Sequence, residues 1–134
     1  MSKLSSHPTL LLLALTLCVP ASSVIADEPA IDFENDIIPI LTAGGCNSGP
    51  CHGKSRGQGG FKLSLFGFDP DFDHAALSRE GRGRRVFLPS AEQSLLLLKP
   101  TGRVPHGGGL RTEFDGPEYR LLKRWIESGM PRRA

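Results

Sequence analysis

The sequence predicts one small, mostly α-helical domain with long glycine-rich loops. Apolar side chains recur at helical spacing near the start of this domain, over residues 33–43, and again at its end, over residues 117–128. The chain is also rich in turn-forming residues, since its 134 residues include 16 glycines and 11 prolines. A chain of this length buries only a modest hydrophobic core, so we expect an additional stabilising feature such as a disulfide, a metal or a covalent cofactor.

The first 26 residues have the pattern of an export signal. Lys3 precedes a leucine-rich run from Leu10 to Val19, and Val24-Ile25-Ala26 has the small-x-small arrangement that a signal peptidase cleaves. The run is too short for a membrane-spanning helix of about 20 residues. We therefore expect a signal peptide over residues 1–26 and a mature domain over residues 27–134, exported to the periplasm or another extracytoplasmic compartment.

The charge balance excludes one class of function. The formal net charge is +2, and loss of the signal peptide removes one basic residue and no acidic one. A nearly neutral domain has no bulk electrostatic attraction to nucleic acid, so nucleic-acid binding is not expected as its main function.

The two terminal helices have clear sequence signals at both ends. The first is predicted over residues 33–43, with Asp32 as N-cap, a kink at Pro39 and a stop at Gly44-Gly45. In the second, Pro117 occupies the first helical position. Its apolar face consists of Leu121, Leu122 and Trp125, and Gly129 with Pro131 ends it.

Shorter elements are predicted between these helices. In chain order they are a glycine-rich loop over 44–60, a strand or extended segment over 61–65, a short helix over 71–80, a basic turn over 81–85, a helix from an N-cap at Ser90 to Lys99, and a second glycine-rich loop over 101–109. Leu95 to Leu98 should form the buried part of the helix that Ser90 begins.

The residues that carry chemistry lie in Cys46-Asn47-Ser48-Gly49-Pro50-Cys51-His52. Two thiols followed directly by a histidine are typical of covalent haem attachment, in which the thiols bind the porphyrin and the histidine binds the iron. Four residues separate the cysteines here, where two are usual, and Gly49-Pro50 lets the extra residues bulge out. Two alternatives stay open, a Cys46–Cys51 disulfide and a zinc site completed by His52 and His74.

Six stretches of the mature chain together resemble a known family. They are Phe33 to Leu41, Gly45 to Gly53, Gly60 to Pro70, Ser94 to Lys99, Val104 to Gly109, and Leu122 to Gly129. In this order they are similar to the planctomycete-type cytochrome c domains found at the start of large secreted proteins. The resemblance implies a cytochrome c-like fold with one covalent haem, attached through Cys46 and Cys51 and ligated on its proximal side by His52.

The same resemblance implies that the N- and C-terminal helices cross beside the haem. Phe33, Ile37 and Leu41 offer one apolar stripe for this contact, and Leu122 and Trp125 offer the other. A haem would add apolar mass to the small core. The side chains expected to line it are Phe61, Leu63, Leu65 and Leu95 to Leu98.

The distal iron ligand has three candidates in the mature chain. His106 lies in a loop before the last helix, where cytochromes of this type present the distal ligand, and it is the first candidate. Met130 follows the last helix and is the alternative, while His74 lies in a polar stretch where an exposed histidine is the default. The fourth possibility is an open iron position. Bis-histidine ligation would lower the reduction potential relative to histidine–methionine ligation.

Arg82, Arg84 and Arg85 form a basic cluster with two interpretations. Guanidinium groups match the geometry of carboxylates, so these arginines are candidates for contacts with the haem propionates. The alternative is a solvated face or a docking patch for an acidic partner.

The function expected from these residues is single-electron transfer by an exported mono-haem cytochrome domain, acting with a redox partner protein that the sequence does not name. The alternative from another class is a disulfide-stapled binding module without haem. A catalyst is not expected, because the sequence has no catalytic triad, phosphate loop or carboxylate pair, unless the sixth iron position is open. Similar domains are usually fused to larger secreted proteins, so the chain is expected to be a free-standing or truncated copy.

Overall fold

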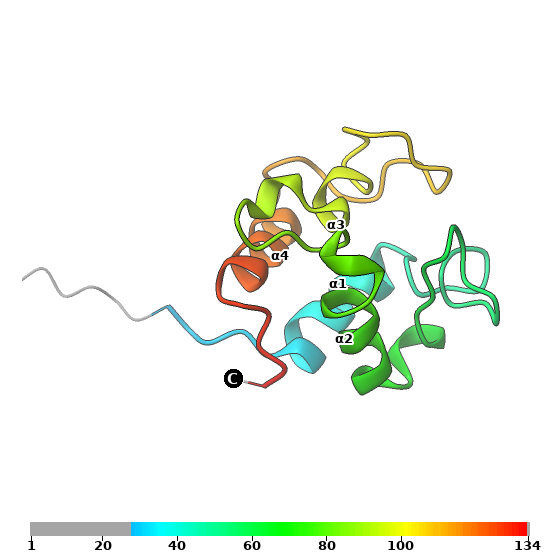
Figure 1. The fold of residues 1–134 in the computed structure, drawn as a ribbon, viewed down its shortest axis with the longest axis horizontal. Helices are drawn as coiled ribbons and strands as arrows, with labels where there is room; N and C mark the ends of the chain where they lie inside the picture. The colour runs from blue at the N-terminus through cyan, green and yellow to red at the C-terminus, as the bar shows by residue number, and fades with distance from the viewer. Residues whose placement is uncertain (1–27, 134) are drawn as a thin grey trace, which may run out of the picture.

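The computed structural model describes residues 28–133, and within this range the chain is helical (Figure 1). The elements are η1 (Phe33–Ile37), α1 (Ile38–Ala43), η2 (Leu65–Gly67), α2 (Pro70–Ser78), η3 (Gly81–Gly83), η4 (Ala91–Gln93), α3 (Leu95–Leu98) and α4 (Pro117–Glu127). The predicted mostly α-helical class is therefore confirmed. The predicted signal peptide lies outside the described residues.

The N-terminal helix begins at its predicted cap and changes its hydrogen-bond register at Pro39. The Asp32 side chain accepts a hydrogen bond from the N–H of Asn35 at 2.9 Å. Pro39 has no N–H, and in an α-helix its ring would collide with the carbonyl group four residues earlier. The wider π-helical turn of η1 leads directly into α1, so a change of hydrogen-bond register lies next to Pro39, where the sequence predicts a kink.

The first and last helices contact each other, as the two apolar stripes predict. The ring of Phe33 lies 5.4 Å from that of Trp125, measured between centroids. Pro117 begins α4, and Gly129, with a φ of 86°, follows its end. The buried apolar residues are Ile31, Phe33, Ile37, Leu41, Leu63, Ala76, Leu77, Val86, Ala91, Leu97, Tyr119, Leu122, Trp125 and Ile126.

Of the two forms predicted for residues 61–65, a strand or an extended segment, the strand is not formed. Within the described residues, the only β pairing that this segment makes is the isolated bridge between Phe61 and Gln58. Leu63 is buried and donates its N–H to the His52 carbonyl at 2.8 Å, so the segment lies along the cysteine loop. Alternating side chains gave the signal of a strand, but a strand also needs a neighbour with which to form a ladder.

The predicted helix from Ser90 to Lys99 is interrupted. Ser94 has an extended backbone, with a ψ of 133°, and it separates the 3₁₀ turn η4 from α3. Its buried hydroxyl accepts a hydrogen bond from the N–H of Phe87 at 2.8 Å, an interaction that ties the break to the preceding loop. Ser90 makes no side-chain cap, and of the four leucines in α3 only Leu97 is buried.

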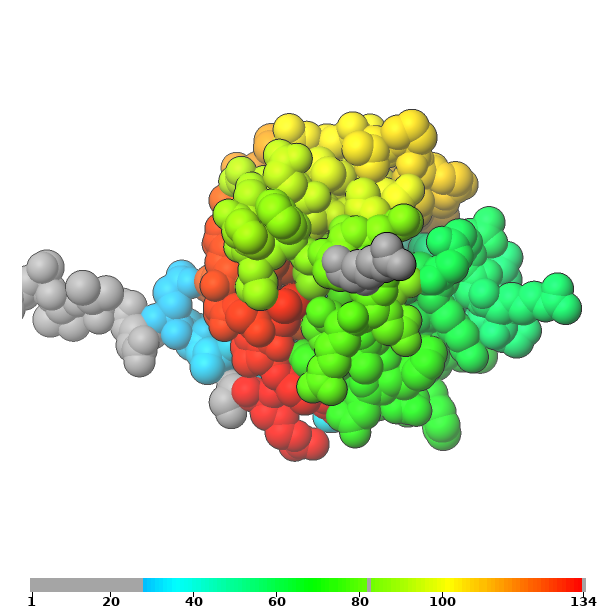
Figure 2. All heavy atoms as spheres, viewed as in Figure 1, coloured from blue at the N-terminus to red at the C-terminus, as the bar shows by residue number. Residues whose placement is uncertain are grey.

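The long loops lie on the side of the molecule away from α4. Residues 44–68 occupy the right-hand edge in Figures 1 and 2, and residues 101–110 lie above them. The predicted glycine-rich loops over 44–60 and 101–109 are confirmed. In the described part of the chain, no helix has the length and apolar character needed to cross a bilayer.

Asp73 ties the start of α2 to the segment before it. Its fully buried carboxylate accepts hydrogen bonds from the N–H and the hydroxyl of Ser64, at 2.5 and 2.8 Å. Burial raises the pKa of the Asp73 carboxyl, and the hydrogen bonds from Ser64 oppose this rise. The folded state therefore binds the proton more tightly than the unfolded state does. The stability that Asp73 contributes is fully present below the unfolded pKa and declines as pH rises towards the folded one.

We expect the variant Asp73→Asn to gain stability relative to wild type as pH rises from about 4 to about 7. The reason is that the variant has no buried charge to form. Urea unfolding of both proteins at several pH values measures this difference. A difference that stays constant over that range would contradict it. The variant Asp73→Ala, which leaves the Ser64 N–H without its acceptor, should be less stable than Asp73→Asn by about 2 kcal/mol at each of these pH values.

Candidate functional site

The two cysteines and His52 lie in a closed turn directly after α1. The helix ends as predicted, with Gly45 at a φ of 70° and the Cys46 N–H donating back to the Leu41 carbonyl at 2.8 Å. The His52 N–H donates to the Cys46 carbonyl at 2.9 Å and closes the loop. A Cβ on Gly49 would meet no atom within 4 Å and Pro50 is exposed, so the loop borders open space at this dipeptide.

Asn47 and Gly53 hold this turn together, and the sequence gives little sign of either role. Asn47 is fully buried; its side-chain Nδ2 donates to the Thr42 hydroxyl at 2.8 Å, while its Oδ1 is buried without a hydrogen-bond partner. A Cβ on Gly53 would lie 2.0 Å from the Asn47 carbonyl oxygen. Only glycine therefore fits at the position directly after His52.

The imidazole of His52 is oriented by Phe61. Its Nδ1 lies 3.0 Å from the Phe61 carbonyl oxygen, and the two rings lie 4.5 Å apart between centroids. Because a carbonyl oxygen only accepts, Nδ1 carries the proton. Burial lowers the pKa of His52, and the positive charges of His106 and Arg85 act in the same direction. The ring is therefore neutral near neutral pH, with its lone pair on Nε2.

The imidazole of His106 is held in the same way from the other loop. Its Nδ1 lies 3.0 Å from the Gly109 carbonyl oxygen, so in the neutral ring the lone pair again lies on Nε2. A Cβ on Gly108 would lie 2.8 Å from Cε1 of this ring, which explains a glycine there. Arg111 donates from Nε to the Gly108 carbonyl at 2.6 Å and ties this loop in place.

The two imidazoles are parallel and close to each other. The planes of the His52 and His106 rings differ by 6°, and their centroids are 6.5 Å apart. Two metal–imidazole bonds of about 2 Å each, together with the ring radii, place the ring centres about 6 Å apart. Histidines that bind a metal usually donate their other ring N–H to a carbonyl or a carboxylate, as both of these histidines do. The 6.5 Å between the centroids of His52 and His106 is therefore close to the separation of two imidazoles on opposite sides of one metal ion.

Both cysteines are free thiols and half-buried. Burial raises the pKa of the Cys46 thiol, the neighbouring Cys51 raises it further, and the positive charge of Arg111 opposes the rise. Cys46 is therefore a thiol near neutral pH. Within residues 28–133, no three side chains of His, Cys, Asp or Glu come together as a metal site, so nothing in the described chain supports the zinc alternative.

His74 and Met130 are held together elsewhere. His74 Nε2 lies 2.9 Å from the Met130 carbonyl oxygen, and the His74 ring packs on Phe33 and Trp125 with centroid distances of 5.0 and 6.0 Å. His74 is thus a half-buried packing residue, and the expectation of an exposed, solvated histidine is wrong. The Met130 N–H donates to the Trp125 carbonyl at 2.9 Å, so the backbone contacts of Met130 are with α4 and α2.

The basic cluster is divided between two environments. The side chain of Arg85 is only 12% exposed, and its guanidinium donates to the carbonyl groups of Ala76 and Gly60 and to Glu80. The guanidinium also lies 4.6 Å from the Phe61 ring centroid. Arg85 is therefore engaged within the protein. Arg84 is exposed, and the side chain of Arg82 lies outside the described part of the chain.

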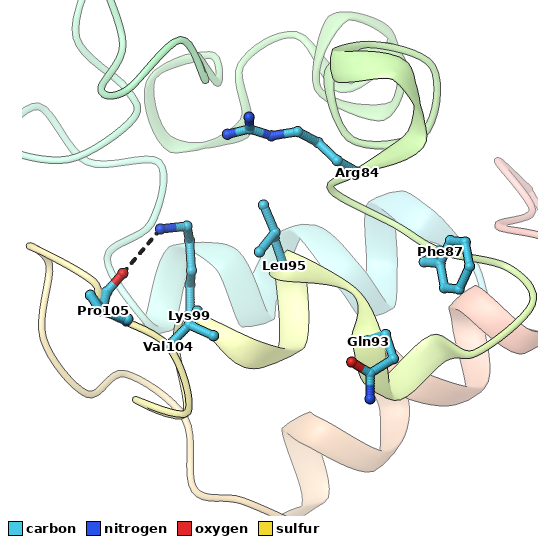
Figure 3. A pocket seen from close by; sticks show the side chains of 7 residues that line it. All are labelled: Arg84, Phe87, Gln93, Leu95, Lys99, Val104 and Pro105. Carbon is cyan, nitrogen blue, oxygen red and sulfur yellow. Dashed lines mark hydrogen bonds between the residues drawn. The ribbon is translucent and has the colours of Figure 1, made fainter.

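Arg84 faces Lys99 across a shallow hollow of about 520 Å³ (Figure 3). Leu95 projects into it from α3, and Lys99 donates from Nζ to the Pro105 carbonyl at 3.1 Å. The hollow is lined by Arg84, Phe87, Gln93, Leu95, Lys99, Val104 and Pro105. Val104 and Pro105 directly precede His106, so this cationic hollow lies beside the loop that carries one of the paired imidazoles.

Comparison of the chain with protein-family models, with curated proteins and with solved structures finds no match.

We expect Gly53→Ala to lower the free energy of unfolding by about 2 kcal/mol or more, because its Cβ collides with the backbone of Asn47. The matched control is Gly49→Ala in the same loop, where the added methyl group meets open space. Denaturant unfolding of the two variants checks this. Equal effects at the two positions would show that the close approach at Gly53 does not constrain the loop.

Proposed function

We propose that this chain is an exported mono-haem c-type cytochrome that carries single electrons. The observation that carries the proposal is the pair of parallel imidazoles of His52 and His106, 6.5 Å apart, each with Nδ1 at hydrogen-bond distance from a backbone carbonyl oxygen. His52 directly follows Cys51, and His106 lies in a loop far along the chain. This arrangement supports His52 as the proximal and His106 as the distal ligand of one haem iron.

The cysteine loop supports covalent attachment beside the proximal ligand. Cys46 and Cys51 are half-buried thiols at the two ends of the turn that His52 closes. In thioether formation each thiol would add across one vinyl group of the porphyrin, with the sulfur bonding to one carbon and the hydrogen passing to the other. Open space at Gly49 accommodates the longer spacer between the cysteines, and the His52 N–H still closes the loop at the Cys46 carbonyl.

Arg84 and Lys99 are the side chains suited to the propionates. Both line the open hollow next to Val104 and Pro105, and neither forms an ion pair within residues 28–133. Arg85 is less suited, because backbone carbonyl groups already occupy its guanidinium. Of the three arginines in the basic cluster, Arg84 is therefore assigned this role, with Lys99 as a second cation.

The two histidines suit electron transfer rather than catalysis. Bound iron supplies the one-electron couple. His52 and His106 would fill both axial positions and leave none for a substrate. The carbonyl groups of Phe61 and Gly109 hold the rings and make them stronger donors, which stabilises the oxidised state. A low potential for a c-type cytochrome is the expected consequence.

We expect replacement of His106 by alanine to open one axial position. The ferric wild-type holoprotein should be low-spin and should lack the far-red charge-transfer band of methionine ligation. The His106→Ala holoprotein should become partly or fully high-spin and should bind added imidazole or carbon monoxide. Optical spectra of both redox states measure these changes.

Met130→Leu is the control for this experiment and should leave the spectrum unchanged, because the described backbone contacts of Met130 are with α4 and α2. A wild-type spectrum that is already high-spin, or a methionine band that Met130→Leu removes, would rule out His106 as the distal ligand.

We expect the double variant Cys46→Ala, Cys51→Ala to contain no covalent haem, since both attachment points are lost. Wild type and variant are produced with the haem-attachment machinery, and haem that survives denaturing electrophoresis is measured for each. A colourless wild-type protein with an intact Cys46–Cys51 disulfide would contradict the proposed function and favour a disulfide-stapled binding module.

A further inference from the structure

A turn before α2 exposes three large apolar side chains. Leu65, Phe66 and Phe68 are 49, 61 and 90% exposed, and Phe68 is the most exposed large apolar residue in the described chain. Isolated exposed apolar side chains are common on protein surfaces and need no explanation. Three of them within four residues of one turn are unusual, because together they expose apolar surface to water in one short segment. We call these three residues the apolar turn.

The backbone of the apolar turn holds its side chains outward. Phe66 has a φ of 54°, a left-handed conformation that a phenylalanine rarely adopts. Its N–H donates to the Asn47 carbonyl at 3.1 Å, and the Phe68 N–H donates to the Leu65 carbonyl at 3.2 Å. A Cβ on Gly67 would lie 2.4 Å from Ile38, so the turn packs closely on α1. The strain at Phe66 therefore persists in a well-packed segment, a feature common at functional sites.

Three exposed cations lie in the loop beside the apolar turn. They are Lys54, Arg56 and Lys62, and none forms an ion pair within residues 28–133. The backbone of Gly57 lies against that of Lys62, because a Cβ on Gly57 would lie 2.8 Å from Cα of Lys62. The Nζ of Lys62 lies 5.4 Å from the Phe72 ring centroid. The sequence contains no acidic residue between Asp36 and Asp69, so the charged side chains of this segment are all basic. One carboxylate tied to it from outside is Glu80, which is paired with Arg85. In Figure 2 this loop lies opposite α4.

We propose that the apolar turn and these three cations form a peripheral binding surface for an anionic lipid bilayer. Phenylalanine and leucine insert at the boundary between headgroups and acyl chains, while lysine and arginine attract anionic headgroups. The apolar turn projects, with Phe68 almost fully exposed, and a bilayer deforms around a projection without needing a matching cavity. This shape favours a bilayer over an acidic protein partner. The proposal goes beyond electron transfer. Because Leu65 is also one of the side chains expected to line a haem, the proposal rests on Phe66 and Phe68, the two most exposed residues of the turn.

Asp69 and Asp71, the acidic residues nearest in sequence to the apolar turn, do not form ion pairs with the three cations. Asp69 caps α2, since its side chain accepts from the Phe72 N–H at 3.0 Å. Asp71 lies 2.9 Å from the guanidinium of Arg132, measured from Oδ1 to Nε. These contacts direct the two carboxylates towards α2 and the C-terminal segment. The positive charge of the neighbouring loop is therefore not cancelled by ion pairs with them.

Co-sedimentation with lipid vesicles tests the proposal on the mature protein. The wild type should bind phosphatidylcholine vesicles that contain phosphatidylglycerol, and added salt should weaken this binding. Phe68→Ser and Phe66→Asn should each reduce the partition coefficient roughly tenfold or more. Asparagine tolerates the left-handed backbone of Phe66, so this variant should fold. Lys54→Gln and Lys62→Gln should each reduce it roughly fivefold.

Leu88→Ser and Arg120→Gln are the matched controls, because both residues are exposed and lie outside the proposed surface. They should leave the partition coefficient unchanged. The proposal fails if wild type does not bind the anionic vesicles, or if the controls weaken binding as much as the variants of the turn. Binding to poly-glutamate without binding to vesicles would also overturn it, in favour of an acidic protein partner. Sedimentation does not require haem, so failure of the proposed function leaves this test intact.

Discussion

Two backbone carbonyl oxygens determine what His52 and His106 can do. The Phe61 carbonyl accepts from Nδ1 of one ring and the Gly109 carbonyl from Nδ1 of the other, so in each neutral ring the lone pair is placed on Nε2. A hydrogen bond at this position also fixes the ring orientation. The two rings held by these bonds are parallel to within 6°, and the proposed cytochrome function rests on this arrangement.

The core and the candidate site are built from different parts of the chain. Phe33 and Trp125 pack the terminal helices together, and the site lies in two glycine-rich loops beside them. Gly53 and Gly108 have no room for a side chain, because backbone or imidazole atoms occupy the space of a Cβ. These two glycines therefore serve close contacts around the histidines.

Sequence periodicity predicts the terminal helices well, because each buries a regular apolar face and has a capping residue. It fails where a single long-range contact decides the local structure. The Ser94 hydroxyl bonds to Phe87 and interrupts a predicted helix. The bond from the Leu63 N–H to the His52 carbonyl decides between the strand and the extended segment that alternation allows for residues 61–65. The pattern of the cysteine loop and the position before the last helix make His52 and His106 candidate ligands. The roles of Asn47, Gly53 and Arg111 depend on contacts between segments, which the sequence does not encode in a local pattern.

Electron paramagnetic resonance of the ferric holoprotein tests the central claim most directly, because this spectrum depends on both axial ligands and on the angle between their planes. With the 6° interplanar angle of His52 and His106, we expect a rhombic low-spin signal typical of two nearly parallel imidazoles. A high-spin signal, or the low-spin signal of histidine–methionine ligation, would contradict the account.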